Sequence, residues 1–429
     1  ERVIFTYADT STRSTYRNHI GQVEREQYQR NSTVRNVYFD YQNTPFLQEE
    51  RNGATGTETA RTEYVYDDYH RISQKSITLD EHNWLSQTWY DSVGRVFREH
   101  DISGNSRGLQ YQYANGTLNR LFETQTGNAY FRATAADQFG NITSATFGTG
   151  INVTKGFDPS TSYLRSLYAN VAGANQAIQD QHYRYDQLGN TRYRSDNSVR
   201  SGSGVVETFT YDVLNRLKTT AQQHALSNTV LNQHFNYTAN GNIASKSNVA
   251  NGATYTYGTQ AALCTQSSSV VAPSHAVSTI GNRYQYCYDS RGNQTHAFED
   301  GAQLRSITYN LFNKPSSITS ADGTSEFFYD ANNALYKRID DTRRGRITTY
   351  LVNGHEYLEY ESGEQMGISE TKRYIQDFAI HSIKNTGDDT LHYLFTDHIG
   401  SGTVITDKNG NVEHRVSFDA FGQRRDGDE

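Results

Sequence analysis

The sequence predicts an all-β protein built from a long antiparallel sheet of stacked β-hairpins. Three observations predict it. A short motif with turn character recurs at steps of 20 to 26 residues. Tyrosine makes up 32 of 429 residues, whereas proline occurs only four times. Short aromatic and β-branched segments, such as Thr348–Tyr350 and Tyr393–Phe395, stand between turn residues. Because twisted sheets cannot stay flat over many strands, we expect this one to curl into a spiral, a barrel-like wall or a solenoid.

The composition favours thin, wetted sheets over one thick core. Only 35% of residues are hydrophobic and the mean hydropathy is -0.80, yet aromatic residues reach 12%. Disordered chains are poor in aromatic residues. Tyrosine can bury its ring and keep its hydroxyl group in contact with water. The chain is therefore expected to fold, with large areas of each sheet exposed to solvent.

Charge, cysteine count and hydropathy exclude several classes. The formal net charge of -7, with mixed signs, argues against a nucleic-acid partner, which would need a basic face. Two cysteines cannot build a disulfide framework. No run of about 18 apolar residues predicts a membrane-spanning helix. No signal-peptide pattern precedes Glu1, and the chain starts in mid-pattern, which indicates a fragment of something longer.

The repeated unit is an aromatic residue, Asp, two variable residues, Gly or a substitute, and a polar residue. The step is 24 residues from Tyr66 to Tyr90, 26 from Tyr211 to Tyr237, and 20 from Tyr309 to Tyr329. Clear copies begin at Tyr90, Tyr185, Tyr211 and Tyr288; looser ones begin at Tyr66, Ala136, Tyr237, Tyr309, Tyr329 and Phe418; degenerate ones begin at Phe157 and Tyr257.

The unit has the chemistry of a bulged hairpin turn. Asp suits the first position of a type I turn, where its side chain can accept bonds from backbone N–H groups. Gly at the fourth position supplies the left-handed residue of a G1 bulge. Where Gly is missing, the sequence has residue types that tolerate positive φ. We therefore predict positive φ at Gly94, Gly189, Gly241, Gly292, His70, Asn215, Asn313 and Asn333. Each unit would then be a hairpin of roughly ten-residue strands.

The Tyr-Asp-x-x-Gly-Arg/Asn series resembles the YD repeats of RHS proteins, which include bacterial polymorphic toxins, components of insecticidal toxin complexes and animal teneurins. The resemblance runs from about Tyr41 to the end. The stretch from Tyr393 through Thr406–Val412 to Arg424 resembles the RHS-associated core that precedes a variable toxin. It implies a repeat wall over residues 1–350 and a core segment over residues 351–429, ahead of a missing C-terminal toxin domain.

The resemblance implies that the sheet spirals into a hollow, cocoon-like shell, which would be a structural container. Its role would be to encapsulate a C-terminal toxin domain and help deliver it in bacterial competition or host attack. The implied partners are the enclosed toxin polypeptide, the remaining N-terminal shell or a second shell chain, and a component of the secretion machinery. The implied location is secreted or exported to the bacterial surface. The alternative is a cell-surface protein for adhesion or carbohydrate binding.

We expect no catalytic residue, cofactor or metal site. Members of the family cut themselves with paired Asp residues beyond the Phe-Asp-x-Phe-Gly motif, here Phe418–Gly422. The chain stops at Glu429, before that stretch, so no catalytic residue is carried over. The first repeats also depart from the pattern: Pro45 stands where positive φ is wanted, and residues 1–40 carry no clean unit.

Several short motifs have both a functional and a structural interpretation. Asp397-His398 has the chemistry of half an acid–base pair, but a strand-end turn is favoured. His355-Glu356 begins like a zincin motif, and Glu359 stands where the second His is needed, so this motif is rejected.

The other motifs are also given structural interpretations. The segment 407–411 resembles part of a calcium loop but is expected to be a turn. Asp388-Asp389 is interpreted as a solvated loop, and the basic cluster 343–346 as a solvated hairpin tip. Cys264 and Cys287 lie 23 residues apart, close to one repeat, and could face each other; two buried thiols are the favoured interpretation.

Overall fold

The computed structural model describes residues 1–7, 11–42, 44–54, 56–104, 106–174, 176–198, 204–224, 230–264 and 270–425. The chain forms two compact units. Unit 1 contains residues 1–108, 256–373 and 384–387, and unit 2 contains residues 109–255, 374–383 and 388–429. Each unit thus combines segments that are far apart in the sequence. The boundary that the sequence places at residue 350 stays a prediction.

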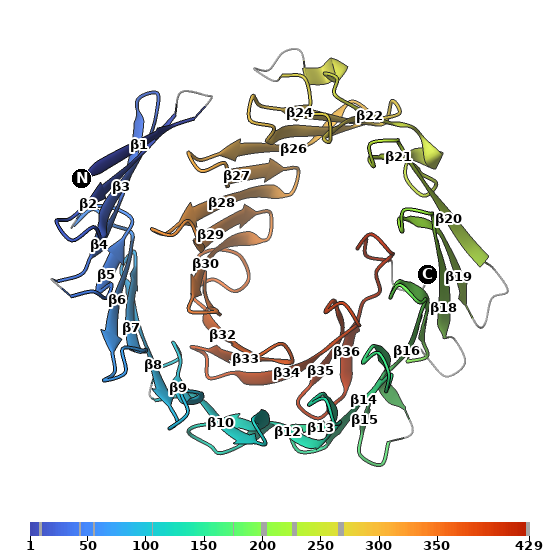
Figure 1. Ribbon diagram of the computed structural model, residues 1–429, viewed down its shortest axis with the longest axis horizontal. Helices are drawn as coiled ribbons and strands as arrows, with labels where there is room; N and C mark the ends of the chain where they lie inside the picture. The colour runs from blue at the N-terminus through green and yellow to red at the C-terminus, as the bar shows by residue number, and fades with distance from the viewer. Residues whose placement is uncertain are drawn as a thin grey trace. The chain divides into compact units, whose positions relative to one another are not determined.

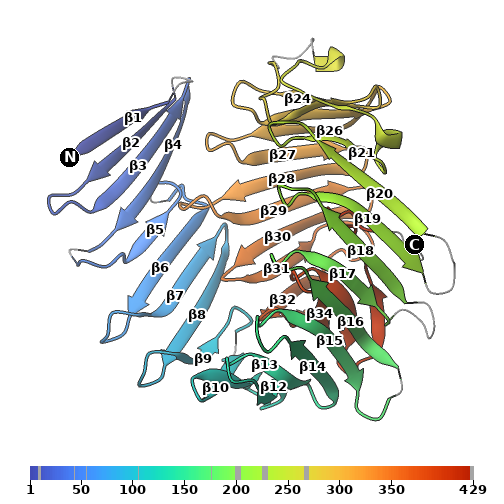
Figure 2. The same ribbon diagram turned by 45° about the vertical axis from the view of Figure 1, so that its right-hand side comes forward.

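The strands of the first sheet, drawn from blue to green in Figures 1 and 2, are β1 Arg2–Thr6, β2 Thr12–Arg17, β3 Val23–Arg30, β4 Thr33–Asp40, β5 Glu49–Arg51, β6 Ala60–Tyr66, β7 Ile72–Leu79, β8 His82–Tyr90, β9 Val96–His100, β10 Gly108–Ala114, β11 Thr117–Glu123, β12 Ala129–Ala136, β13 Ile142–Phe147, β14 Ile151–Phe157, β15 Leu164–Val171, β16 Ala177–Tyr185, β17 Thr191–Asp196, β18 Val205–Tyr211, β19 Leu217–His224, β20 Val230–Tyr237 and β21 Ile243–Lys246.

The second sheet contains β22 Tyr255–Tyr257, β23 Val277–Ile280, β24 Tyr284–Tyr288, β25 Gln294–Glu299, β26 Ala302–Tyr309, β27 Pro315–Ser320, β28 Gly323–Tyr329, β29 Leu335–Thr342, β30 Gly345–Val352, β31 His355–Tyr360, β32 Ser369–Ile375, β33 Ala379–Lys384, β34 Asp389–Thr396, β35 Gly402–Asp407 and β36 Val412–Arg415. Two short 3₁₀ helices, η1 Ala250–Gly252 and η2 Ala262–Cys264, are the helical elements of the described residues.

The predicted fold class, all-β with long antiparallel sheets of hairpins, is confirmed. Successive strands pair antiparallel, as in β6 with β7 and β7 with β8. The expected strand length was wrong: strands have 3 to 9 residues. The strands are shorter than expected because five residues of each repeat form the bulged turn, as in 91–95, and further residues form the opposite hairpin tip. Among the described residues, no helix is long and apolar enough to cross a membrane.

The bulged turn at Asp91 shows the geometry of the repeat. The Asp91 N–H donates to the Arg95 carbonyl at 2.8 Å, and the Gly94 N–H donates to the Asp91 carbonyl at 3.0 Å. Asp91 Oδ1 accepts from the N–H groups of Val93 and Arg95, and Oδ2 accepts from Arg95 Nε. The strand register shifts at Tyr90, as a G1 bulge requires. One carboxylate therefore satisfies three donors in five residues.

The same two backbone bonds close twelve further turns, which begin at Asn18, Asp67, Asp137, Asp186, Asp212, Thr238, Asp289, Asn310, Asp330, Asp397, Asp407 and Asp419. All eight predicted left-handed residues have positive φ, for example 89° at Gly94, 58° at Asn215 and 62° at His70. Residues 1–40 do contain a unit, contrary to expectation. It spans 17–22, and the sequence motif hid it because Arg17 and Asn18 replace the aromatic residue and Asp.

The tyrosine that precedes the turn links one hairpin to the one before it. Tyr90 donates its hydroxyl to the carbonyl of Ile72, the residue that opens the second strand of the preceding hairpin, at 2.9 Å. Tyr211 does the same with Thr191 at 2.7 Å. Equivalent bonds join Tyr237 to Leu217, Tyr309 to Gln294, and Tyr329 to Pro315. Tyrosine is therefore a cross-link between repeats as well as a packing residue.

In unit 1, strands of the two sheets pack face to face through a small core. Ala60, Ile77 and Leu79 of β6 and β7 meet Tyr336, Tyr350 and Val352 of β29 and β30. Polar contacts surround this core. Arg35 donates to the Tyr329 carbonyl at 2.7 Å, and Lys337 pairs with Asp80 at 2.6 Å.

In unit 2, a larger core lies between β10–β16 and β33–β35 (Figure 1). Its buried members are Leu109, Leu121, Tyr130, Phe131, Ala145, Phe147, Ile151, Val153, Ala169, Ile178, Ile375, Phe378, Ala379, Tyr393, Phe395 and Val404. Aromatic rings stack through it, with Phe147 4.9 Å from Phe378 and 5.6 Å from Tyr393. The residues before Thr396 are thus fixed by apolar packing.

The favoured interpretation of the cysteines was wrong, because Cys264 and Cys287 form a disulfide. Their Cα atoms lie 5.4 Å apart, and both residues are buried. Cys264 lies in η2, not on a strand neighbouring β24, so the near-repeat spacing does not explain the pairing. The Leu263 N–H donates to Gln285 Oε1 of β24 at 3.1 Å, so η2 lies against β24.

Replacing Gly94 by valine is expected to lower the free energy of unfolding by about 1–3 kcal/mol, because a β-branched residue is strained at a φ of 89°. The site itself has room, since the nearest atom to an added Cβ is Arg71 Nη1 at 3.6 Å. Asn215→Gly is the control and should change stability by less than about 1 kcal/mol. Urea unfolding measures both, and an equal effect of the two changes would contradict the turn assignment.

Removing the hydroxyl in Tyr90→Phe is expected to destabilise the fold by about 1 kcal/mol, because the Ile72 carbonyl loses its donor. Tyr69→Phe is the matched control, since Tyr69 is 80% exposed and loss of its hydroxyl should leave the stability unchanged. Denaturant midpoints distinguish the two. Equal midpoints for both variants would show that the tyrosine bond does not link the hairpins.

Stability should fall as the pH is lowered. The Arg216 guanidinium, and then backbone N–H groups, hold the pKa of Asp212 below its usual range. A group with a lowered folded pKa contributes stability above its unfolded pKa, near 3.9, and loses it as pH falls through the folded pKa. Urea midpoints should therefore drop between about pH 5 and 3, and less so in Asp212→Asn. An unchanged pH profile in that variant would exclude this role.

Candidate functional site

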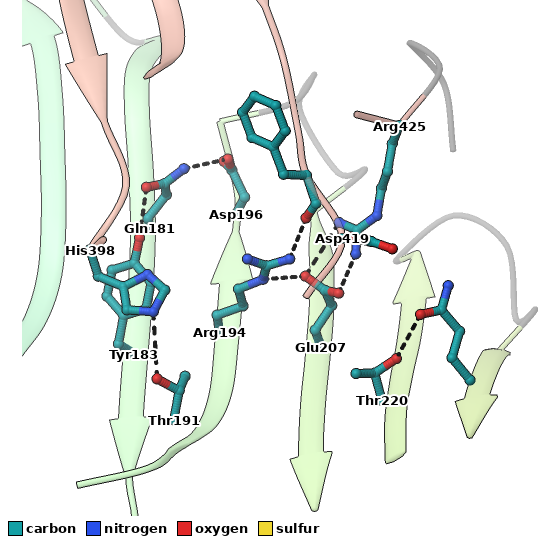
Figure 3. Close-up of polar contacts among 12 residues, drawn as sticks. Gln181, Tyr183, Thr191, Arg194, Asp196, Glu207, Thr220, His398, Asp419 and Arg425 are labelled. Atoms are coloured by element: carbon teal, nitrogen blue, oxygen red, sulfur yellow. Dashed lines mark hydrogen bonds and ion pairs between the residues drawn. The ribbon is translucent and has the colours of Figure 1, made fainter. Parts of the chain in front are cut away.

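The best-defined polar site of the described residues lies on one face of β16–β20 in unit 2 (Figure 3). Alternate residues of β16, Gln179, Gln181 and Tyr183, are buried on this face. The strand register places Arg194 opposite Tyr183 and Glu207 opposite Arg194. Period-2 alternation therefore carries a polar row across neighbouring strands. The C-terminal segment, residues 396–425, supplies partners to Gln179, Arg194 and Glu207 of this row.

Glu207 is the centre of the site. It is 3% exposed and pairs with Arg194 of β17 and with Arg425, near the end of the described chain. Arg194 also donates from Nη2 to the Phe418 carbonyl at 2.5 Å. A buried carboxylate is tolerated when it is paired and fully hydrogen-bonded. Two guanidinium groups on one carboxylate thus fix residues 418–425 against the sheet.

Two further contacts join a side chain of one layer to a backbone carbonyl of the other. Arg415 donates from Nη1 to the Ile178 carbonyl at 2.8 Å, and burial lowers the pKa of Arg415. Gln179 donates from Nε2 to the Thr396 carbonyl at 2.8 Å. A hydrogen bond to a backbone carbonyl depends on where the accepting backbone runs, more than on which side chains that backbone carries. The C-terminal segment is therefore held at both of its ends.

Aromatic contacts complete the site. The Phe421 ring lies 4.8 Å from that of Phe235, and Lys246 Nζ lies 4.0 Å over Phe421. Burial lowers the pKa of Lys246. The His398 ring lies 4.4 Å from that of Tyr183. Together with the Glu207 contacts, these rings define what we call the C-terminal anchor: Gln179, Tyr183, Arg194, Glu207, Phe235, Lys246, His398, Arg415, Phe418, Phe421 and Arg425.

Asp397-His398 forms the expected strand-end turn. Asp397 Oδ1 accepts from the N–H groups of Ile399 and Ser401, so its carboxylate serves the turn. Burial lowers the pKa of His398, which favours the neutral ring. Its Nε2 lies 3.5 Å from the Thr191 hydroxyl, and Nδ1 is buried without a hydrogen-bond partner in the part of the chain that the structure describes. The pair is an element of the anchor.

Two motifs with metal-like patterns have other partners. His355 is buried in β31, and burial lowers its pKa; Glu359 of the same strand reaches His82 at 3.3 Å. Asp407 closes a bulged turn through the N–H groups of Asn409 and Asn411, as expected. Across the described ranges, no cluster of three or more His, Cys, Asp or Glu residues has metal-site geometry. The expectation of no metal, cofactor or catalytic residue stays a prediction.

The basic cluster and the acidic pair differ in outcome. Arg343 and Arg344 form the tip between β29 and β30, as expected. Asp388 lies in an exposed loop, as expected. Asp389 is also exposed, at 46%, but it begins β34 and its carboxylate pairs with His381 of β33. His381 Nδ1 in turn lies 2.7 Å from the Tyr130 hydroxyl. The antiparallel pairing of β33 with β34 brings His381 and Asp389 together, and no local sequence motif predicts that pair.

Sequence reasoning missed the residues that hold the anchor. These residues lie within strands, outside the turn motif: Arg194, Glu207 and Arg415. Their partners in the opposite layer are 218 to 237 residues away in the chain. The one available signal was a charged residue, Glu207, at an inward position of an otherwise alternating strand. That pattern indicates a buried charge with a partner, but not which partner.

The fold was compared with known proteins. No protein-family model and no curated protein sequence matches the chain. Solved structures do match. The crystal structure of TcdB2-TccC3 without its hypervariable C-terminal region has a TM-score of 0.78 and 13% identity, covering 98% of this chain and 23% of that one. The crystal structure of TcdB2-TccC3-Cdc42 has a TM-score of 0.77 and 14% identity, with the same coverage.

A third match is the Tc holotoxin pore of Photorhabdus luminescens with the mutation TccC3-D651A, at a TM-score of 0.77 and 13% identity. It covers 98% of this chain and 23% of that one. The likeness shows that this chain has an RHS-like β fold, shared with the matching part of these toxin complexes. The chain spans about a quarter of the length of the chains it matches.

Glu207→Gln is expected to destabilise unit 2 by about 3–5 kcal/mol, because it leaves two guanidinium groups beside a neutral amide in a buried site. The matched control is Glu413→Gln, since the Glu413 side chain is 40% exposed and pairs only at the surface with His392. Thermal or urea unfolding reports the difference. Limited proteolysis should also release residues 416–425 from the Glu207 variant alone. Equal stability of the two variants would show that the ion cluster does not hold the segment.

Proposed function

We propose that this chain is a section of an RHS-type container wall that encloses a toxin polypeptide. The shared fold with Tc toxin complexes supports the wall, although the likeness covers only the fold. The spiral closure into a hollow shell, and the division at residue 350 into repeat wall and core segment, belong to this proposal. So does the absence of a catalytic centre within residues 1–429.

The observation that carries the proposal is the C-terminal anchor. It holds residues 396–425 against a polar sheet face through Glu207 and through bonds to backbone carbonyls. A wall that guides a polypeptide along its face needs donors that act on any backbone. Gln179 and Arg194 of the polar row on β16–β20 are such donors, because they donate to the carbonyls of Thr396 and Phe418. An enzyme would instead need a nucleophile–base pair or an aligned metal site.

The proposed container role implies the partners of this chain. They are an enclosed toxin polypeptide, the rest of the shell or a second shell chain, and a component of the secretion machinery. The proposed location is outside the producing bacterium or at its surface. Delivery would serve competition between bacteria or attack on a host. The rival proposal, a surface protein for adhesion or carbohydrate binding, differs in requiring no enclosed polypeptide.

The test compares residues 1–429 with a longer polypeptide that includes the sequence following them in the natural gene. The shorter chain should turn over nothing and stay intact. The longer one should divide C-terminal to residue 429, and the cut piece should remain with the wall on gel filtration, because enclosure retains it. Mass spectrometry of both samples locates any cut.

Two outcomes would contradict the container. Cleavage within residues 1–429 would place a catalytic centre in this chain. Clean separation of the C-terminal piece on gel filtration would show that the wall encloses nothing, and adhesion would become the better hypothesis. Protease treatment of the longer polypeptide gives an independent readout, since an enclosed piece resists digestion at concentrations that degrade the same piece when free.

A further inference from the structure

A cavity of about 390 Å³ lies beside the main core of unit 2. Its walls come from strands β11–β16 of the first sheet and from the segments around Phe378 and Phe395 of the second. Most of the lining side chains are apolar, and five of them are phenylalanines: Phe131, Phe147, Phe157, Phe378 and Phe395. Ligand sites commonly have volumes in this range, and an apolar cavity favours an apolar ligand over water.

The phenylalanines on the core side of the cavity are held in place by one another. The Phe147 ring lies 4.9 Å from that of Phe378 and 5.9 Å from that of Phe395. The Phe131 and Phe378 rings are 5.5 Å apart. These rings cannot turn into the cavity without losing their contacts in the core. The space is therefore a defined feature of the fold.

Lys155 occupies a position of β14 where the alternation of the strand favours an apolar side chain. Ile151, Val153 and Phe157 share its face of the strand, and the last two line the cavity together with Lys155. In the sheet register, Lys155 is opposite Leu167, another lining residue. Among the residues that the structure describes, the Lys155 ammonium has no hydrogen bond or ion pair. An unpaired cation thus extends from a core-facing position.

The mouth of the cavity is marked by its exposed lining side chains, which are Lys155, Gln376 and Asp377. Asp377 lies on the tip just before Phe378. A second lining carboxylate, that of Asp397, already accepts from two N–H groups of its own turn. Lys155 is therefore the charged group that belongs to the strand wall and still lacks a partner.

We propose that this cavity binds an amphipathic carboxylate, a molecule with an apolar body and one carboxylate group, such as a medium-chain fatty acid. The apolar body fills the space between the phenylalanines, where a polar group would lose its hydration. The carboxylate pairs with Lys155 at the mouth, since a charge-assisted bond to an ammonium favours an anion. This binding does not depend on the proposed enclosure of a polypeptide.

Isothermal titration calorimetry with ligands that share one alkyl chain tests the role of the headgroup. One decanoate should bind per chain, more tightly than 1-decanol, and decylammonium should bind most weakly. In carboxylates of about six to about twelve carbon atoms, each added methylene should tighten binding about fourfold until the cavity is full. Equal affinity for decanoate and 1-decanol would overturn the proposal, because Lys155 would then only extend into water. So would the absence of saturable binding.

Two variants separate the headgroup from the cavity. Lys155→Gln should weaken decanoate binding at least about threefold and leave 1-decanol binding unchanged. Lys218→Gln is its control, since Lys218 is exposed on β19. Leu164→Trp should fill the space beside Phe157 and weaken both ligands at least about tenfold. Its control is Tyr168→Trp, because Tyr168 is 38% exposed on the same strand and does not line the cavity.

The controls decide whether binding occurs at this cavity. An equal loss of decanoate binding in Leu164→Trp and Tyr168→Trp would place the ligand elsewhere and overturn the proposal. A Lys155→Gln variant that keeps the full preference for decanoate over 1-decanol would do the same. If circular dichroism shows that Leu164→Trp is unfolded, the exposed Lys155 position still provides the test, judged by the headgroup preference alone.

Discussion

The structure depends on one side-chain oxygen in the repeated turn, the Oδ1 atom of an Asp or, at Asn18 and Asn310, of an Asn. The Asp at the first turn position accepts two backbone N–H groups and, in turns such as 91–95, a side-chain donor as well. These bonds fix a left-handed residue and a register shift at every turn, and so set where the next strand begins. Since the register follows from the turn, the inward face of each strand follows too. A sheet with thin apolar cores needs this local definition of register.

Layers are built on that frame by a few strong contacts. Where a tyrosine precedes the turn, it can join its hairpin to the previous one, as Tyr211 does with Thr191. Between layers, buried ion pairs accompany the apolar cores. Arg373 and Asp101 are paired at 2.7 Å in unit 1, with side chains 0% and 4% exposed. Glu207 has the same role in unit 2. Loss of one partner from such a pair costs far more than loss of a surface pair.

The sequence predicts the features that depend on the five residues of a turn. Turn positions, positive φ and the all-β class follow from local chemistry, and the residues at Gly94 and Asn215 were predicted on that basis. The unit at Asn18 was missed, because two substitutions hid a turn whose geometry is unchanged. The disulfide and the partners of Glu207 were missed for another reason. They depend on which distant strands pack together, and no local pattern contains that information.

Amide hydrogen exchange tests the central claim, that the first-position carboxylate holds the turns and thereby the strand register. The N–H groups of Arg95, Asn141, Asn190 and Arg216 each donate to the Asp four residues earlier. The account predicts that these amides exchange slowly, and more slowly than amides at the opposite tips, such as that of Glu81. Exchange in the bulged turns that is as fast as in those tips would contradict it.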